Sequence, residues 1–324
     1  MIKTLKIENF KSIKHLKLDC KKINLFIGEP NTGKSNILEV IGVLSHTYHG
    51  NLSQFVRFEV MTDLFYDHVQ DEQISIRFNE SSLRIQFADG AFRGTYSRTG
   101  SEQSVDFTYD YYGRPQAFRP NVDCQRYKSY RFFKRLNFPN PKSDYLRPPD
   151  GDNLLAVIFN DRQMRGVVKD IFGKFGYRLV FRPQEGKMEI QKELEDVLVS
   201  FPYSLASETL QRLVFYLAAI NSNKNSILSF EEPEAHAFPY YTKYLAERIA
   251  LDENRNQYFI ATHNPYLLTS ILEKTPKQDI AIFATFLDNY ETKAEPLAET
   301  QMTEILGDMG YDVFFNIERF LAKD

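Results

Sequence analysis

One octapeptide near the start of the sequence has the residue types and spacing of a phosphate-binding loop. Glycines at its first and sixth positions are followed by Lys34 and Ser35, which fits the pattern G-x-x-x-x-G-K-[ST]. In such loops, backbone N–H groups and a helix N-terminus surround the phosphates, the lysine reaches the terminal phosphates, and the hydroxyl ligates Mg²⁺. We therefore expect the chain to bind ATP with magnesium. The residues expected to bind the nucleotide are Gly28, Glu29, Pro30, Asn31, Thr32, Gly33, Lys34, Ser35 and Asn36.

A pair of adjacent carboxylates forms the second candidate group. Glu231 and Glu232 follow the apolar run 227–230, which is typical of a buried strand. We expect Glu231 to hold Mg²⁺ through water, and Glu232 to polarise the water that attacks the γ-phosphate. An acidic strand end taken alone is more often simply solvated, so this interpretation depends on its combination with the phosphate loop.

A histidine is the third candidate. His263 closes a further apolar stretch, residues 258–262, which also predicts a strand. At such a strand end a histidine could sense the γ-phosphate. The residues expected to catalyse hydrolysis are therefore Lys34, Glu232 and His263, and those expected to bind the metal are Ser35 and Glu231.

The surrounding pattern predicts the elements that must position these groups. Residues 2–8 and 23–27 are predicted strands, and a helix is expected from Lys34 to about Ser45. A strand before the glycine loop and a helix after it favour a phosphate loop over an ordinary glycine turn. Short antiparallel strands are expected over residues 73–112, and six prolines between 113 and 150 favour loops. A helix over 205–220, a helix over 240–250 and strands near 279–287 and 290–297 complete the prediction.

Composition excludes several classes of protein. The 324 residues are 43% hydrophobic and 26% charged, with a formal charge of -3, so bulk charge does not favour a coat of nucleic acid. No apolar run approaches the roughly 18 residues of a membrane span, and no signal-like apolar core follows the start, so we expect a cytoplasmic protein. Cys20 and Cys124 form no CxxC pair, which favours free thiols over a disulfide or a zinc site.

Taken together, these pieces resemble the ATPase heads of the ABC class, in the branch of the SMC, RecF and OLD families. The opening Leu5–Ile13 is similar to that branch's N-terminal strand and N-F-[KR]-S turn, and Ser35–Ile41 is similar to its first helix. Residues 230–236 and 261–265 look like its Walker B, D-loop and H-loop stretches. The likeness covers about a third of the chain, namely residues 1–45 and 200–270.

The resemblance implies an α/β fold of the P-loop NTPase class. It implies an ABC-type head with a central mixed or parallel sheet, an N-terminal antiparallel β subdomain and an inserted α/β lobe. We expect one head over residues 1–324: an N-terminal half (1–112), the inserted lobe (113–200) and a C-terminal half (201–324). No sustained heptad pattern predicts a coiled-coil arm in the insertion.

The resemblance also implies a composite site between two copies of the chain. In that branch, a signature helix of one subunit closes over ATP held by another, and the matching segment here, residues 205–212, offers Ser207 as the contact to the γ-phosphate. Glu208 and Thr209 stand where the family has glycines that let the backbone approach phosphate. The family's Q-loop glutamine follows the first helix and a strand, and the spacing leaves Gln54 and Gln73 both open.

A basic and aromatic stretch between residues 112 and 138 stands outside these motifs. Such mixtures can contact nucleic acid backbones and stack on bases. The overall negative charge favours the alternatives, which are a solvated helix with core aromatics or an arginine face for an acidic protein. The cations proposed to contact nucleic acid are Arg126, Lys128, Arg131, Lys134 and Arg135.

Two functional hypotheses follow. The first is an ATPase that couples closure of a homodimer to an effector acting in trans, such as a nuclease, because OLD-like heads often serve antiphage defence or DNA repair. The residues after His263 are too few for a TOPRIM nuclease. The second is a scaffold that binds ATP and recruits a partner with little turnover. A small-molecule kinase fits less well, since such kinases usually lack the doubled carboxylate and the strand-end histidine.

Overall fold

The computed structural model describes residues 1–100, 104–307 and 311–321. Its first sheet is antiparallel, with strand order β2-β1-β4-β5-β6-β7-β8. Alternating burial along β1 and β2 places Leu5, Ile7 and Leu18 in the core and the intervening lysines in solvent, as expected for a sheet with one wet face. The strands are β1 (Thr4–Phe10), β2 (Ile13–Asp19), β4 (Ile74–Phe78), β5 (Ser81–Ala88), β6 (Ala91–Arg98), β7 (Ser104–Tyr109) and β8 (Pro115–Ala117).

The second sheet is mixed and carries the phosphate loop. Its order is β16-β15-β3-β14-β13-β9, with β15, β3, β14, β13 and β9 parallel and only β16 antiparallel. The strand β3 is buried along its whole length, which is typical of a parallel strand covered on both faces. These strands are β3 (Ile23–Gly28), β9 (Tyr127–Tyr130), β13 (Ile227–Glu231), β14 (Gln257–Ala261), β15 (Ile280–Asp288) and β16 (Glu291–Pro296).

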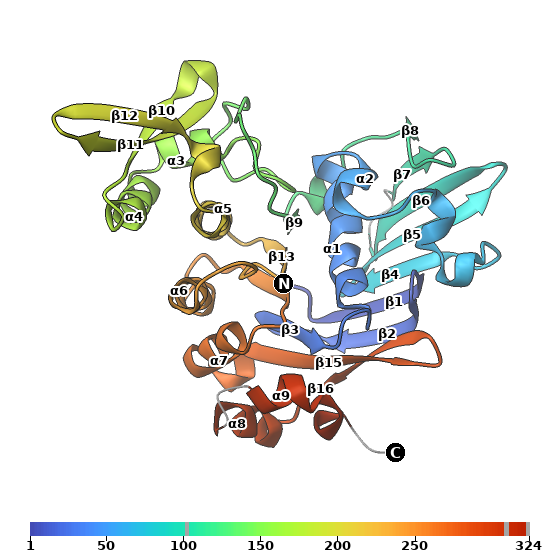
Figure 1. The fold of residues 1–324 in the computed structure, drawn as a ribbon. Coiled ribbons are helices and arrows are strands. Elements are labelled where there is room, and N and C mark those ends of the chain that lie inside the picture. The colour runs from blue at the N-terminus through green and yellow to red at the C-terminus, as the bar shows by residue number, and fades with distance from the viewer. Residues whose placement is uncertain (101–103, 308–310, 322–324) are drawn as a thin grey trace.

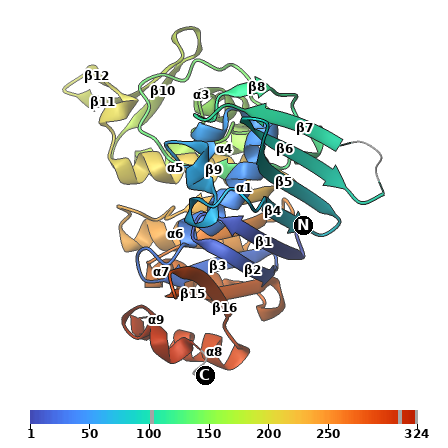
Figure 2. The same cartoon turned by 90° about the vertical axis from the view of Figure 1, so that its right-hand side faces the viewer.

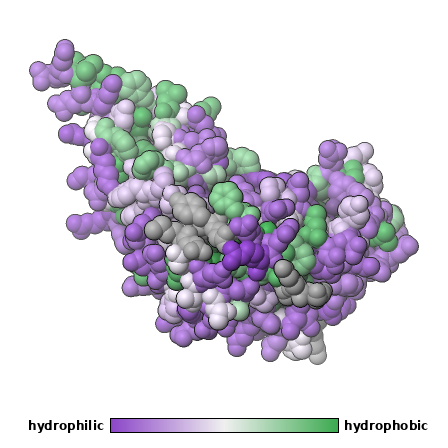
Figure 3. Space-filling model, turned by 60° about the horizontal axis from the view of Figure 1, so that its bottom comes forward, coloured by the Kyte–Doolittle hydropathy of each residue, from purple (hydrophilic) through white to green (hydrophobic). Residues whose placement is uncertain are grey.

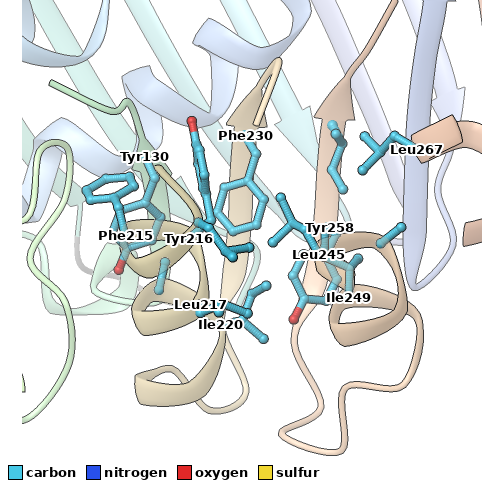
Figure 4. Packing of buried hydrophobic residues seen from close by; sticks show 14 of the residues in the cluster. Tyr130, Phe215, Tyr216, Leu217, Ile220, Phe230, Leu245, Ile249, Tyr258 and Leu267 are labelled. Atoms are coloured by element: carbon cyan, nitrogen blue, oxygen red, sulfur yellow. The ribbon is translucent and has the colours of Figure 1, made fainter. Parts of the chain in front are cut away.

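Helices and the first sheet cover the two faces of the mixed sheet (Figure 1). One face packs on α1 and, beyond it, on the antiparallel sheet, through residues such as Phe26, Ile41 and Phe259. The other face packs on α5, α6 and α7, where Phe230 lies among Tyr130, Tyr216 and Tyr258 (Figure 4). The helices are α1 (Lys34–His49), α2 (Leu52–Phe55), α3 (Leu154–Asn160), α4 (Arg162–Gly173), α5 (Glu208–Ser222), α6 (Pro239–Ala250), α7 (Pro265–Lys274), α8 (Glu299–Gly307) and α9 (Tyr311–Phe315).

A third sheet of three antiparallel strands forms a lobe away from the mixed sheet. It consists of β10 (Arg178–Arg182), β11 (Lys187–Leu194) and β12 (Val197–Pro202), with α4 packed against it. The lobe projects at the upper left of Figure 1, while Figure 2 shows the antiparallel sheet from its own side. Most of the face in Figure 3 is hydrophilic, and hydrophobic side chains gather on the projecting part. Beside the turn between β11 and β12, the strand ends expose Leu194, Val197 and Leu198.

The fold class expected from the sequence is confirmed. The antiparallel strands of residues 73–112, the helix at Lys34 and the late strands and helices all lie where they were predicted, within a few residues. The strand β2 was not predicted, nor were β8 and β9 inside the proline-rich segment. Of these, β9 pairs with β13 in the mixed sheet. Both cysteines are buried free thiols. Within the described ranges, no helix is long and apolar enough to cross a membrane.

Candidate nucleotide-binding site

Three neighbouring parallel strands deliver the candidate residues to one edge of the mixed sheet. β3 ends at Gly28, β14 ends just before Thr262 and His263, and β13 ends at Glu231. The carboxyl ends of parallel strands meet at the same edge, which is where open α/β sheets bind their ligands. The sequence motifs, separated by some 200 residues, therefore form one site.

The two glycines of the loop are required by their surroundings. Gly28 has φ +147°, and a Cβ there would lie 2.3 Å from the Thr285 carbonyl oxygen. Gly33 has φ +91° in the left-handed region, and a Cβ there would lie 2.0 Å from Thr292 Oγ1. These two close approaches come from β15 and β16, so the late hairpin of the mixed sheet shapes the loop. Only glycine fits both positions without displacing that hairpin.

The lysine of the loop is held inside it. Lys34 is only 6% exposed, and its Nζ donates to the carbonyl oxygens of Gly28, at 2.9 Å, and Glu29, at 2.6 Å. Burial lowers the pKa of Lys34 to about 8, against the opposing effect of nearby carboxylates such as Glu232. Thr32 supports the same turn by donating to the Glu29 carbonyl at 2.8 Å.

Ser35 and Glu231 are in direct contact, although 196 positions separate them. The Ser35 hydroxyl donates to Glu231 Oε1, and the Glu231 side chain is 29% exposed. A hydroxyl and a carboxylate oxygen side by side are the hard oxygen donors that Mg²⁺ prefers. The residues present therefore fit the expected metal, since both proposed ligands face one point between α1 and β13.

Glu232 and His263 lie next to this pair. His263 Nε2 is 3.5 Å from Glu232 Oε1, and both side chains are partly exposed. Burial, followed by the positive charge of Lys34, lowers the pKa of His263, which favours a neutral imidazole. Glu232 has φ +43°, and its N–H donates to the Ala261 carbonyl, which fixes the carboxylate at the sheet edge.

Glu234 is a further carboxylate near this site, and it was not among the residues predicted from the sequence. It is 4% exposed and accepts a hydrogen bond from the Thr262 hydroxyl, while burial raises its pKa to about 7. It joins the segment after β13 to the end of β14. Its contact therefore connects the stretches that carry Glu232 and His263.

Two of the residues predicted to bind the nucleotide do not point their side chains at the phosphate loop: Asn36 faces away from it, and Ser207 lies apart from it. The Asn36 side chain donates to Ser12 Oγ at 2.7 Å, so a contact to phosphate would have to come from its backbone N–H. Ser207 caps the N-terminus of α5, accepting from the Leu210 N–H at 3.4 Å, and is exposed. It lines an apolar pocket with Leu205 and Phe238 instead of the phosphate loop. A contact of Ser207 with a nucleotide would therefore need a nucleotide held by a second copy of the chain.

Two arginines that were not assigned to this site face the proposed metal ligand. Arg57 Nη2 lies 3.5 Å from Glu231 Oε1, and Arg131 Nη2 lies 3.7 Å from Glu231 Oε2. Arg57 also contacts Glu39 at 2.7 Å.

The sequence left two candidates for the Q-loop glutamine. Gln54 lines the same small pocket as Ser35 and Glu231, while Gln73 precedes β4 in the antiparallel sheet. The residue that directly follows β9 beside β13 is neither of them but Arg131.

The structure corrects the predicted nucleic acid patch at several positions. Lys128 is only 5% exposed, and its Nζ contacts Asn223 and lies 3.6 Å from the Tyr145 ring centre, because β9 is part of the mixed sheet. Arg131 faces Glu231, and Arg135 donates to Asp150 at 2.6 Å. The stretch is therefore not one continuous basic surface. Arg126 and Lys134 are exposed.

Comparisons with known families divide the chain into two overlapping matches. The model "AAA ATPase domain" matches residues 1–147, and the model "AAA domain, putative AbiEii toxin, Type IV TA system" matches residues 130–269. Together they include both the phosphate loop and the strand ends described above. A structure titled as the SmcHead bound to the C-winged helix domain of ScpA superposes with a TM-score of 0.54 at 15% identity, covering 93% of this chain and 99% of that one.

The chain is therefore similar to AAA ATPase domains over residues 1–269, and it has the fold of an SMC head. A second Smc head structure, with an extended coiled coil and bound to the C-terminal domain of ScpA derived from Pyrococcus furiosus, shares the fold. Its TM-score is 0.53 at 13% identity, covering 95% of this chain and 99% of that one. Both likenesses concern the fold, which is the ABC-type head expected from the sequence.

The curated relatives match this chain over only part of their own length. The Septu protein PtuA of Bacillus mycoides is 23% identical over 317 residues, covering 90% of this chain and 41% of that protein. An uncharacterized protein of Methanocaldococcus jannaschii is 32% identical over 92 residues, covering 24% of this chain and 42% of that protein. The chain thus spans about two fifths of the length of the curated relatives it matches.

Proposed function

We propose that this chain binds ATP with magnesium on the loop Gly28–Ser35 and hydrolyses it with Glu232. The observation that carries the proposal is the contact of Ser35 with Glu231, which brings the loop helix and the acidic strand end together beside Lys34. The backbone N–H groups at the start of α1 and the Lys34 ammonium would bind the phosphates. Ser35 and Glu231 would hold the metal, Glu231 through water.

The chain's own groups supply the remaining chemistry. Bound magnesium would neutralise charge on the β- and γ-phosphates as it develops. Glu232 would accept a hydrogen bond from the attacking water and take its proton. His263, 3.5 Å from Glu232, would hold that carboxylate in place and contact the γ-phosphate.

We further propose that two copies close over the nucleotide. Ser207 is exposed at the N-terminus of α5, where the positive end of the helix and its free N–H groups favour an anion. Within one chain it contacts only its own helix among the interactions described, so it would act on the nucleotide of a second copy. Residues 1–112, 113–200 and 201–324 remain the proposed division of this head.

Closure would be coupled to an effector in trans, such as a nuclease. A role in antiphage defence follows from the resemblance to the OLD branch, and the similarity to a Septu protein supports it. DNA repair is the other role of that branch. Contact with nucleic acid through Arg126 and Lys134 remains part of the proposal.

Binding and closure are tested separately. Lys34→Ala should lower the affinity for a fluorescent ATP analogue by at least ten-fold, while Lys224→Ala, at a lysine outside the site, should not change it. Ser207→Arg should leave that affinity unchanged and abolish an ATP-dependent shift from monomer to dimer in analytical ultracentrifugation of the Glu232→Gln background. Equal binding by Lys34→Ala would contradict the site, and a dimer of unchanged stability with Ser207→Arg would contradict the closure.

A second candidate, a nucleotide-gated scaffold with little turnover, is favoured by one observation. Glu208 and Thr209 replace the small residues that would let the α5 backbone approach phosphate, and the Thr209 hydroxyl is already engaged with the His236 carbonyl at 2.6 Å. A looser composite site would bind ATP but hydrolyse it slowly. The rate of turnover separates the two candidates.

A further inference from the structure

The position of Arg131 in the mixed sheet is the starting observation. β9 pairs in parallel with β13, with Tyr130 opposite Phe230, so the next residues along the two strands are Arg131 and Glu231. The Arg131 N–H donates to the Pro149 carbonyl at 2.8 Å, which anchors its backbone independently of the side chain. A cation is therefore placed at the strand end directly beside the proposed metal ligand.

The charges around Glu231 are arranged on both sides of its carboxylate. Arg57 lies 3.5 Å from Oε1 and Arg131 lies 3.7 Å from Oε2, while the Ser35 hydroxyl also donates to Oε1. Arg57 has a second carboxylate, Glu39, at 2.7 Å. Glu231 is the only ion-pair partner of Arg131 in the described part of the chain. Of the two arginines, Arg131 is therefore the one without a second carboxylate partner among the described residues.

We infer that Arg131 and a divalent metal ion are alternative partners of Glu231, so that Arg131 sets the magnesium requirement of ATP binding. Both are attracted to the negative charge of one carboxylate, with Arg131 at Oε2 and the proposed metal at the Oε1 side beside Ser35. A metal bound there takes up the charge that holds the guanidinium and repels it, so loading of the metal weakens the pair of Arg131 with Glu231. This inference rests on the proposed function.

The freedom of Arg131 to move is consistent with its surroundings. Its side chain is 41% exposed, and its guanidinium lies 5.9 Å from the Phe133 ring centre, with Phe133 itself 49% exposed. A partly exposed pair of this kind contributes little to stability, so exchanging the arginine for a metal costs little. Arg131 acts here as a positioning residue for Glu231.

The test is the Mg²⁺ concentration that gives half-maximal binding of a fluorescent ATP analogue. Arg131→Gln should lower that midpoint by about two- to five-fold, the range expected from losing one partly exposed ion pair. Arg131→Lys keeps the charge and should stay near the wild-type value. Arg147→Gln is the matched control, because Arg147 is 40% exposed and pairs with Asp152 at 3.5 Å away from Glu231. Circular dichroism verifies that all variants fold.

The outcomes separate the inference from the function on which it rests. A lower midpoint in Arg131→Gln, with Arg147→Gln and Arg131→Lys unchanged, supports the competition. A midpoint equal to or above that of the wild type overturns it while leaving ATP binding intact. If the wild type binds no analogue at any Mg²⁺ concentration, the proposed function itself is wrong, and the inference falls with it.

Discussion

Replacing Gly33 by alanine tests whether the late hairpin shapes the phosphate loop. An L-residue in the left-handed region costs about 1–2 kcal/mol, and the new Cβ would meet Thr292 Oγ1 at 2.0 Å and Thr292 Cγ2 at 2.7 Å. Overpacking of this kind costs about 1–3 kcal/mol more. The total loss of unfolding free energy is therefore roughly 2–5 kcal/mol. Since each kcal/mol lowers Tm by about 2–4 °C in domains of roughly 150–250 residues, we expect a fall of at least ~4 °C.

Thermal denaturation and binding of the ATP analogue measure the effect. Gly90→Ala is the matched control, because Gly90 has φ +75° with no atom within 4 Å of an added Cβ, so it carries the backbone cost without the clash. In the Gly33→Ala background, Thr292→Ala removes Oγ1 and Cγ2 of Thr292. The nearest side-chain atom at that position is then its own Cβ, 2.9 Å from the Cβ added at residue 33, so part of the lost stability and of the lost binding should return. If Gly33→Ala melts no lower than Gly90→Ala and binds the analogue like the wild type, the role given to Thr292 is wrong.

Further predictions concern the buried carboxylate and the core. Burial raises the pKa of Glu234 from 4.5 to about 7, so its contribution to stability is complete below pH 4.5 and is lost as pH rises through 7. Glu234→Gln should therefore be more stable than the wild type at pH 8, by up to ~3 kcal/mol, and should lose that advantage near pH 4.5. The measurement is urea unfolding, and the same midpoint for variant and wild type at both pH values would contradict this. Phe230→Ala should cost about 3–5 kcal/mol, because the ring is fully buried beside Tyr216 at 5.0 Å between centres, whereas Phe133→Ala, at an exposed ring, should cost less than ~0.5 kcal/mol.

The sequence predicted the parts of this site that depend on local pattern. The loop Gly28–Ser35 has a fixed spacing, and the apolar runs before Glu231 and His263 mark buried parallel strands, so their meeting at one sheet edge followed from topology. The structure places all of them together, as expected. Their catalytic and metal-binding roles remain predictions.

The contacts that were not predicted arise where strands pair although no local sequence pattern marks the pairing. Arg131 stands in a proline-rich segment that reads as loop, and only the pairing of the short strand β9 with β13 brings it to Glu231. The same pairing buries Lys128, which composition alone placed on a basic surface. Likewise, the approach of Thr292 to Gly33 depends on how β16 follows β15. Each of these is a tertiary contact across more than 80 residues.

The rate of ATP hydrolysis by the wild type, compared with Glu232→Gln under magnesium, tests the central claim most directly. The substitution keeps the size of the side chain and its position after β13 but removes the proton acceptor, and a general base contributes about 10²- to 10⁴-fold to rate. We predict slow but measurable turnover by the wild type that falls at least ten-fold in Glu232→Gln, with binding of the ATP analogue retained in both. Equal rates in the two proteins, with and without DNA, would contradict the ATPase account and favour the scaffold.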